Sequence, residues 1–250
     1  MRIVALIQAR MDSKRLPGKV LMDLNGMPTI KHIYRRLLKC RQVDEVCISW
    51  GCTCEKDEKV GCLPCIAKVT EAFGFMPRIW TGSEHNLVAR HLGAAYAMRA
   101  DAIVRITGDC PLVDPMLVDQ AVEQYRANYP RAQVLTNSFP KAWWPDGLDL
   151  DIQSIEVLQR IAADKDFPKE EYIGPMLKCG WFTWDVMPYP SEDLSGLRIT
   201  LDYPSDHEAM TAILKKIGND CWDWTKIPAD LIPQSKRPNY LDRVGYVEKK

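Results

Sequence analysis

Residues 3–19 read Ile3-Val4-Ala5-Leu6-Ile7-Gln8-Ala9-Arg10-Met11-Asp12-Ser13-Lys14-Arg15-Leu16-Pro17-Gly18-Lys19, and this stretch decides the class of fold. The apolar run 3–7 is typical of a buried parallel strand, and a basic loop follows it directly. Ligands of open α/β sheets bind outside the carboxyl ends of the strands. A polyphosphate could be held there by side chains and backbone amides, namely those of Arg10, Ser13, Arg15, Gly18 and Lys19. The stretch therefore predicts a nucleotide site.

The loop matches neither of two common nucleotide-binding motifs. It lacks the Walker spacing Gly-x-x-x-x-Gly-Lys-Ser/Thr and the Rossmann pattern Gly-x-Gly-x-x-Gly. Taken singly, basic residues more often solvate a surface loop than bind a ligand. The nucleotide hypothesis therefore depends on further blocks of the sequence.

Strand and helix patterns alternate beyond the loop. Apolar side chains repeat at helical spacing in Ile30, Ile33, Tyr34, Leu37 and Leu38. Strands are predicted near residues 46–48, 78–80 and 102–106, with helices over about 65–73 and 86–98 between them. Helix-length crossovers between short strands predict right-handed βαβ units. We therefore expect an α/β fold with a doubly wound, mainly parallel, Rossmann-like sheet and helices on both faces.

Composition limits the class of protein. The chain has 250 residues, 46% of them hydrophobic, which suffices for a sizeable core in one α/β domain. Lys plus Arg and Asp plus Glu number 33 each, so no overall field favours nucleic acid or an anionic membrane as a partner. The N-terminal apolar run is too short for a secretory signal and no stretch approaches a membrane span, so we expect a cytoplasmic protein.

Four further blocks follow the basic loop in order. They are Gly82-Ser83-Glu84-His85-Asn86-Leu87-Val88-Ala89-Arg90, Val104-Arg105-Ile106-Thr107-Gly108-Asp109-Cys110-Pro111-Leu112-Val113-Asp114-Pro115, Pro145-Asp146-Gly147-Leu148-Asp149-Leu150-Asp151 and Arg198-Ile199-Thr200-Leu201-Asp202-Tyr203-Pro204. With residues 8–19, these blocks resemble the cytidylyltransferase family, which includes CMP-sialate and CMP-Kdo synthetases and spore coat polysaccharide biosynthesis protein F. The resemblance extends from residue 2 to about residue 217 and implies a fold of the nucleotide-diphospho-sugar transferase type.

The resemblance implies a donor site for CTP. Gln8 and Ala9 correspond to positions that line the cytosine pocket, and the triphosphate would be clamped by Arg10, Ser13, Arg15 and Lys19. The implied reaction is attack by an acceptor oxygen on the α-phosphorus of CTP, with release of pyrophosphate. Two rival hypotheses stay open, namely transfer of another nucleotide onto a sugar phosphate, and a non-catalytic nucleotide-binding or scaffold protein.

Asp109 and Asp202 are the expected magnesium ligands. Asp109 follows the predicted strand at 102–106, and Asp202 follows residues 197–201, which we also expect to be a strand. Both side chains would project into one crevice, where carboxylates suit Mg²⁺. The metal would bridge phosphate oxygens and offset charge on pyrophosphate, with the ammonium of Lys19 nearby as the third catalytic group. The resemblance implies the same metal role, although each aspartate alone could be a turn or helix-start residue.

The acceptor is expected beside Trp143-Trp144-Pro145, where stiff aromatic surface meets acidic side chains. The predicted acceptor-binding residues are Asp146, Asp149, Asp151 and Arg90. Arg90 and Arg105 could equally pair with carboxylates beneath the site. The family more often has Glu at the position of Asp151, and its usual Glu-His-Val-Thr-Pro-Tyr block is here Glu170-Glu171-Tyr172-Ile173-Gly174-Pro175-Met176. These departures leave the acceptor open between an acidic 2-keto sugar and a phosphorylated or phosphonylated small molecule.

Nine cysteines in a chain without a recognisable export signal indicate thiols or metal ligands rather than a disulfide framework. Four of them form a group foreign to the family, with the spacing Cys52-x-Cys54 and Cys62-x-x-Cys65. Paired cysteines of this kind are typical of a structural Zn²⁺ site, which four thiolates would close to substrate. Ordinary reduced thiols, or a redox pair at Cys62 and Cys65, are the alternatives.

The chain is expected to form a nucleotidyltransferase domain over residues 1–221, followed by an irregular C-terminal arm over 222–250. Within the domain, we expect a cysteine-rich insertion at about 50–66 and an acceptor-side region at about 130–200. Ser205 is predicted to cap the last helix, with Glu208 completing a capping box. The related synthetases imply a homodimer.

Overall fold

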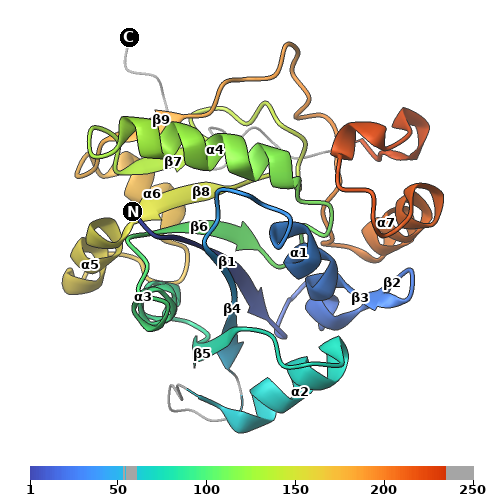
Figure 1. Ribbon diagram of the computed structural model, residues 1–250, viewed down its shortest axis with the longest axis horizontal. Helices are drawn as coiled ribbons and strands as arrows, with labels where there is room; N and C mark the ends of the chain where they lie inside the picture. Colours follow the sequence, from blue (N-terminus) through green and yellow to red (C-terminus); the bar gives the residue numbers. More distant parts are fainter. Residues whose placement is uncertain (53, 55–60, 235–250) are drawn as a thin grey trace.

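The computed structural model describes residues 1–52, 54 and 61–234 and is built around one seven-stranded sheet (Figure 1). The strand order is β5 (Ile79–Ser83), β4 (Glu45–Cys52), β1 (Ile3–Arg10), β6 (Ala102–Thr107), β8 (Asp151–Ser154), β7 (Val134–Thr136) and β9 (Trp184–Val186). β8 runs antiparallel to both of its neighbours, and the other pairings are parallel. The predicted α/β class and mainly parallel sheet are confirmed.

Helices cover both faces of the sheet. They are α1 (Thr29–Leu37), α2 (Leu63–Phe73), α3 (Leu87–Ala97), α4 (Pro115–Asn128), α5 (Ile155–Ala163), α6 (Ile173–Lys178) and α7 (Pro204–Ile217). Successive residues of β1 point to opposite faces, so Ile3 and Ala5 pack with α1, α2, α4 and α7, whereas Val4 and Leu6 pack with α3, α5 and α6. α1 and α3 accordingly lie on opposite sides of β1 (Figure 1). This two-sided burial explains the uninterrupted apolar run at residues 3–7.

Short elements connect the main ones. The 3₁₀ helix η1 (Lys19–Leu21) follows the basic loop, and a small hairpin of β2 (Asp23–Leu24) and β3 (Met27–Pro28) leads into α1. Two further 3₁₀ helices, η2 (Trp224–Lys226) and η3 (Ala229–Leu231), lie in the segment predicted to be an irregular arm. The remainder of that arm, residues 235–250, lies outside the described residues, as do residues 53 and 55–60 of the cysteine-rich insertion.

Two local predictions near Asp202 are wrong. Residues 197–201 are extended but belong to no strand of the sheet, because the segment makes only isolated backbone contacts. The amide of Ile199 donates to the carbonyl of Asp146 at 2.7 Å, and the amide of Leu201 donates to the carbonyl of Asp109 at 2.8 Å. Ser205 does not cap α7, whose N-cap is Tyr203. The capping carboxylate is that of Asp206, which accepts bonds from the amides of Asp202 and Tyr203.

Within the described residues, no helix combines the length and the hydropathy that a membrane span requires.

Candidate active site

A polar cavity of about 900 Å³ opens at the carboxyl ends of the central strands. Its wall includes Gln8 and Arg10 from the end of β1, Thr107 and Asp109 from the end of β6, and Asp151 from β8. Asp202, just before α7, and Asp206, in its first turn, also line the cavity. The volume lies in the range of small-molecule sites, and the location is where open α/β sheets bind their ligands.

Lys19 lies between the two predicted metal-binding carboxylates. Its Nζ is 2.6 Å from Oδ2 of Asp109 and 2.9 Å from Oδ1 of Asp202. Arg15 adds a second cation, with Nη2 2.6 Å from the same Asp202 oxygen. Gly18, whose φ of +72° favours glycine, turns the chain into η1 and so aims Lys19 at the carboxylates. The structure thus brings together residues that are 90 and 183 positions apart in the sequence.

The ammonium of Lys19 and the carboxylate of Asp109 stabilise each other's charged forms. Burial alone would lower the pKa of Lys19, but attraction to Asp109 and hydrogen bonds to both carboxylates raise it above its usual value. Burial would likewise raise the pKa of Asp109, and the nearby Lys19 ammonium lowers it instead. Lys19 and Asp109 are therefore both ionised at neutral pH.

The two aspartates fit a hard divalent cation. Their oxygens lie within 2.9 Å of one ammonium nitrogen, so both already face a single positive charge. The side chains of Asp109 and Asp202 are 23% and 12% exposed, which leaves access from the cavity. Carboxylate oxygens in such a partly open position match the preference of Mg²⁺ for a few protein oxygens plus water and phosphate.

Arg198 is a site residue to which sequence reasoning gave no role. Its guanidinium contacts Asp146 at 2.5 Å, Asp202 at 3.0 Å and Asp206 at 2.8 Å. Hydrogen bonds to Asp206 are the first cause of its raised pKa, and burial opposes them. The predicted acceptor residue Asp146 is thereby fixed in an ion pair at the cavity wall. The signal that could have found Arg198 is a charged residue inside the apolar run Leu197–Leu201.

Arg105 links Gln8 to the acidic wall of the cavity. Its Nε donates to Oε1 of Gln8 at 2.7 Å, and its Nη1 is 3.0 Å from Oδ2 of Asp151. Thr136 donates to the other oxygen of Asp151 at 2.8 Å. Burial, partly offset by Arg105, raises the pKa of Asp151. Because Gln8 accepts from Arg105 through its carbonyl oxygen, its amide N–H groups are left to donate to a ligand.

Arg90 also lines the cavity, but its guanidinium is buried among backbone carbonyls. Nη1 donates to the carbonyls of Ser83 and Glu84, and the residue is 2% exposed. Burial lowers the pKa of Arg90 to about 10. A Cβ added at Gly51 would lie 2.9 Å from Arg90 Nη1, so the arginine occupies the space over the paired glycines Gly51 of β4 and Gly82 of β5. Arg90 is therefore held by the backbone beneath the cavity.

The other predicted donor and acceptor residues differ in their exposure to the cavity. Arg10 and Asp149 line it, and Nη1 of Arg10 is 3.3 Å from Oε1 of Glu170. Ala9, a residue of β1, is 1% exposed and belongs to the hydrophobic core. Ser13 Oγ accepts from the amide of Leu16 within the basic loop. In the described part of the chain, Ala9, Ser13 and Lys19 are not among the lining residues of the cavity, and Lys19 reaches it only through its contacts with Asp109 and Asp202.

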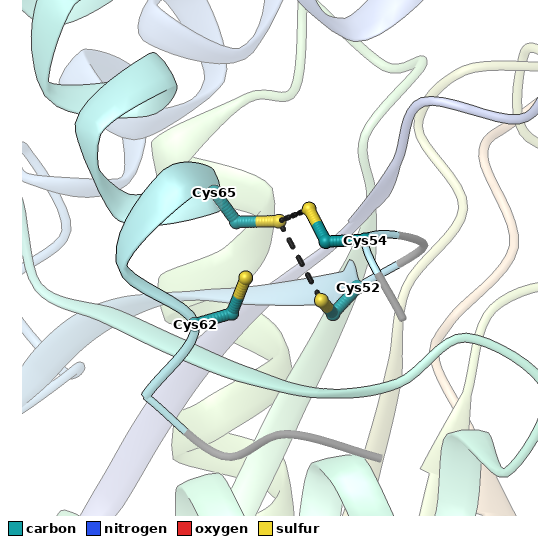
Figure 2. A group of neighbouring side chains, drawn as sticks. All are labelled: Cys52, Cys54, Cys62 and Cys65. Carbon is teal, nitrogen blue, oxygen red and sulfur yellow. Dashed lines mark hydrogen bonds between the residues drawn. The ribbon is translucent and has the colours of Figure 1, made fainter. Parts of the chain in front are cut away.

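The four cysteines form a separate group at the end of β4. The sulfurs of Cys52, Cys54, Cys62 and Cys65 all lie within 4.8 Å of one another (Figure 2). None of them lines the cavity just described. The spacing of the cysteines in the sequence therefore correctly identified a cluster in space.

Comparison with known proteins places this geometry in a family. The family model of cytidylyltransferases matches residues 4–141. The 3-deoxy-manno-octulosonate cytidylyltransferase of Trichlorobacter lovleyi is 35% identical over 129 residues, which cover 51% of this chain and 46% of that protein. The chain thus matches about half the length of that relative. An uncharacterized protein of Methanocaldococcus jannaschii is 33% identical over 222 residues, covering 86% of this chain and 84% of its own.

Two solved structures share this fold over most of the chain. A cytidylyltransferase from Leptospira borgpetersenii superposes with a TM-score of 0.75 at 27% identity, covering 86% of this chain and 87% of its own. A CMP:2-keto-3-deoxy-manno-octonic acid synthetase, solved with CTP, superposes with a TM-score of 0.63 at 20% identity, covering 86% and 99% of the two chains. The second likeness concerns the fold alone. From the family model, which matches more than half of the chain, and from the sheet, we conclude that this chain belongs to the cytidylyltransferase family.

Proposed function

We propose that the protein is a Mg²⁺-dependent cytidylyltransferase that transfers CMP from CTP to an oxygen of a small acceptor and releases pyrophosphate. The observation that carries the proposal is the contact of Lys19 with both Asp109 and Asp202, the two carboxylates that line the cavity. Two carboxylates for a metal and two cations for phosphates meet there, as nucleotidyl transfer requires. The family model supports the choice of a cytidine nucleotide.

The donor half of the site consists of β1 and the basic loop. The amide N–H groups of Gln8, held in place by Arg105, would donate to the acceptor atoms of cytosine. Arg10, Arg15 and Lys19 would bind the triphosphate, with phosphate oxygens replacing the present carboxylate partners of Arg15 and Lys19. Ala9 and Ser13 would act through the backbone and the shape of the loop, because the Ala9 side chain is buried and Ser13 bonds Leu16.

Asp109 and Asp202 would hold the metal, which when bound supplies positive charge to the phosphate oxygens and the departing pyrophosphate. In the proposed step, the acceptor oxygen forms a bond to the α-phosphorus while the bond from that phosphorus to the α,β-bridging oxygen breaks. Pyrophosphate leaves with the bonding electron pair, and water takes the proton of the acceptor hydroxyl. The chain's residues contribute by positioning and charge, so no covalent nucleophile is needed.

The acceptor would bind on the acidic side of the cavity, near Asp149 and the Asp146–Arg198 pair. Several curated relatives are named 3-deoxy-manno-octulosonate cytidylyltransferases, which favours an acidic 2-keto sugar over a phosphorylated or phosphonylated molecule. Arg90 and Asp151 would support this wall from beneath, since both are buried in contacts with the protein.

Pyrophosphate release tests the proposal. CTP, UTP, GTP and ATP are each offered with Mg²⁺ and a panel of acidic 2-keto sugars, sugar phosphates and phosphonates. We expect CTP-selective release with a 2-keto sugar, and Asp149→Asn should raise the KM for that acceptor while leaving the KM for CTP unchanged. Selective turnover of another nucleotide with a sugar phosphate would favour the first rival function. CTP binding without turnover across the panel would favour a non-catalytic scaffold.

We further propose that the enzyme is a cytoplasmic homodimer in which residues 1–221 form the nucleotidyltransferase domain. The resemblance to CMP-sugar synthetases supports the dimer. Light scattering after gel filtration tests it directly, and a monomeric mass at working concentrations would contradict it.

A further inference from the structure

The four cysteine sulfurs approach one another too closely for chance and too loosely for disulfides. Sγ of Cys65 lies 3.4 Å from Sγ of Cys54 and 3.7 Å from Sγ of Cys52, and the four sulfurs lie within 4.8 Å of one another (Figure 2). A disulfide would bring two sulfurs to about 2.05 Å. In a tetrahedral zinc site with bonds of about 2.3 Å, neighbouring sulfurs are about 3.8 Å apart. The separations of 3.4 and 3.7 Å lie close to this value, and all four sulfurs are near enough to ligate one ion.

We propose that Cys52, Cys54, Cys62 and Cys65 bind one structural Zn²⁺ ion. Tetrahedral sets of four sulfurs select zinc or iron–sulfur clusters, and a single small tetrahedron suits one zinc ion. Four protein ligands fill the coordination sphere, so the ion would have no position for water or substrate. The site is therefore separate from the proposed magnesium site and from catalysis.

The fold fixes two parts of the cluster independently. Cys52 is the last residue of β4, which is paired with β5 through Cys52 and Ser83. Cys62 is the N-cap of α2, and its amide donates to Oγ1 of Thr81 on β5 at 2.8 Å. Cys65 lies in the first turn of α2, one helical turn from Cys62. Cys52, Cys62 and Cys65 are buried, and Cys54 is exposed.

Zinc would join the end of β4 to the start of α2, beside the start of the basic loop at Arg10. Gly51, directly before Cys52, is in register with Arg10 of β1. A Cβ added at Gly51 would lie 3.2 Å from Cβ of Arg10 and 2.9 Å from Nη1 of Arg90. The cluster therefore holds the strand end against which Arg10 packs. Its expected contribution is to stability and to the placement of Arg10 rather than to the chemical step.

Elemental analysis of the full chain tests the proposal. Protein purified under reducing conditions and dialysed without chelator should contain one zinc per chain and no iron. Replacing zinc with Co²⁺ should give the absorption bands of tetrahedral cobalt thiolate. Cys65→Ser and Cys54→Ser should lose the metal and lower Tm. The control Cys40→Ser should keep one zinc, because Cys40 follows α1, contacts the carbonyl of Pro115 and does not belong to the cluster.

Three results would overturn the inference. The first is wild-type protein that contains no zinc and in which all nine cysteines titrate as free thiols after denaturation. The second is a disulfide between Cys62 and Cys65 in the native protein, which would support the redox alternative. The third is full retention of zinc in Cys65→Ser and Cys54→Ser. All of these readouts are independent of CTP turnover, so the zinc proposal and the proposed function can fail separately.

Discussion

Arg198→Met should destabilise the protein strongly. Arg198 contacts Asp146, Asp202 and Asp206 at 2.5–3.0 Å, and the four side chains are between 6% and 13% exposed. Removal of one partner from such a buried group leaves carboxylates uncompensated and typically costs about 3–5 kcal/mol. Asp202 keeps Lys19 and Arg15, so the loss falls mainly on Asp146 and Asp206. For a chain of this length, the cost corresponds to a fall in Tm of about 6–20 °C.

The matched variant is Arg198→Lys. A lysine keeps the positive charge but cannot place a planar fork across Asp146 and Asp206, so we expect a smaller loss of about 1–2 kcal/mol. Urea unfolding at neutral pH without nucleotide measures both free energies. A loss below about 1 kcal/mol in Arg198→Met, or equal losses in the two variants, would refute the view that this guanidinium compensates a buried acidic cluster.

Three further perturbations test other contacts. Asp206→Asn should lower the free energy of unfolding at pH 7. Burial would raise the pKa of Asp206, but hydrogen bonds from Arg198 and two backbone amides lower it. The ionised carboxylate therefore stabilises the fold above about pH 4, and this stabilisation is lost as the pH falls through the folded-state pKa. A wild-type advantage that persisted unchanged well below pH 3 would contradict this. Gly147→Ala should cost about 2–4 kcal/mol, because its φ is +115° and the new Cβ would lie 2.5 Å from the carbonyl oxygen of Ile199. Gly26→Ala is its control, with φ of +82° and no described atom within 4 Å, and equal losses would show that the close approach to Ile199 is unimportant. Lys19→Met should increase the rise in Tm caused by Mg²⁺ without nucleotide, because the ammonium no longer occupies the space between the carboxylates; no increase would argue against a metal site at Asp109 and Asp202.

The sequence predicted those parts of the fold that depend on local pattern. The run Ile3–Ile7 is buried on both faces, and its apolar continuity marks it as a central strand. The cysteine cluster was predicted because ligand pairs close in sequence meet across one connection. The predicted strand at 197–201 was wrong, because an extended apolar segment resembles a strand whether or not a neighbouring strand is available to pair with it.

The sequence placed Lys19, Asp109 and Asp202 at one site, but it could not predict the direct ion pairs between these distant segments. Lys19 meets Asp109 and Asp202 only because the loop after β1 and the turn after β6 lie at the same edge of the sheet. Arg198 was missed for the same reason, since its partners come from separate segments. Asp206, rather than Ser205, caps α7 because its carboxylate also binds Arg198, a tertiary contact that outweighs the local capping pattern.

Turnover of CTP by Asp109→Asn tests the central claim most directly. The acceptor would be the best one found for the wild type, and the surface variant Asp220→Asn serves as a matched control because that carboxylate is 75% exposed in a pair with Arg35. We expect Asp109→Asn to lower kcat by about 100-fold or more, since a metal ligand contributes several kcal/mol to the transition state, while the circular dichroism spectrum stays unchanged. Undiminished pyrophosphate release by a folded Asp109→Asn enzyme would contradict the proposed role of the Lys19, Asp109 and Asp202 group.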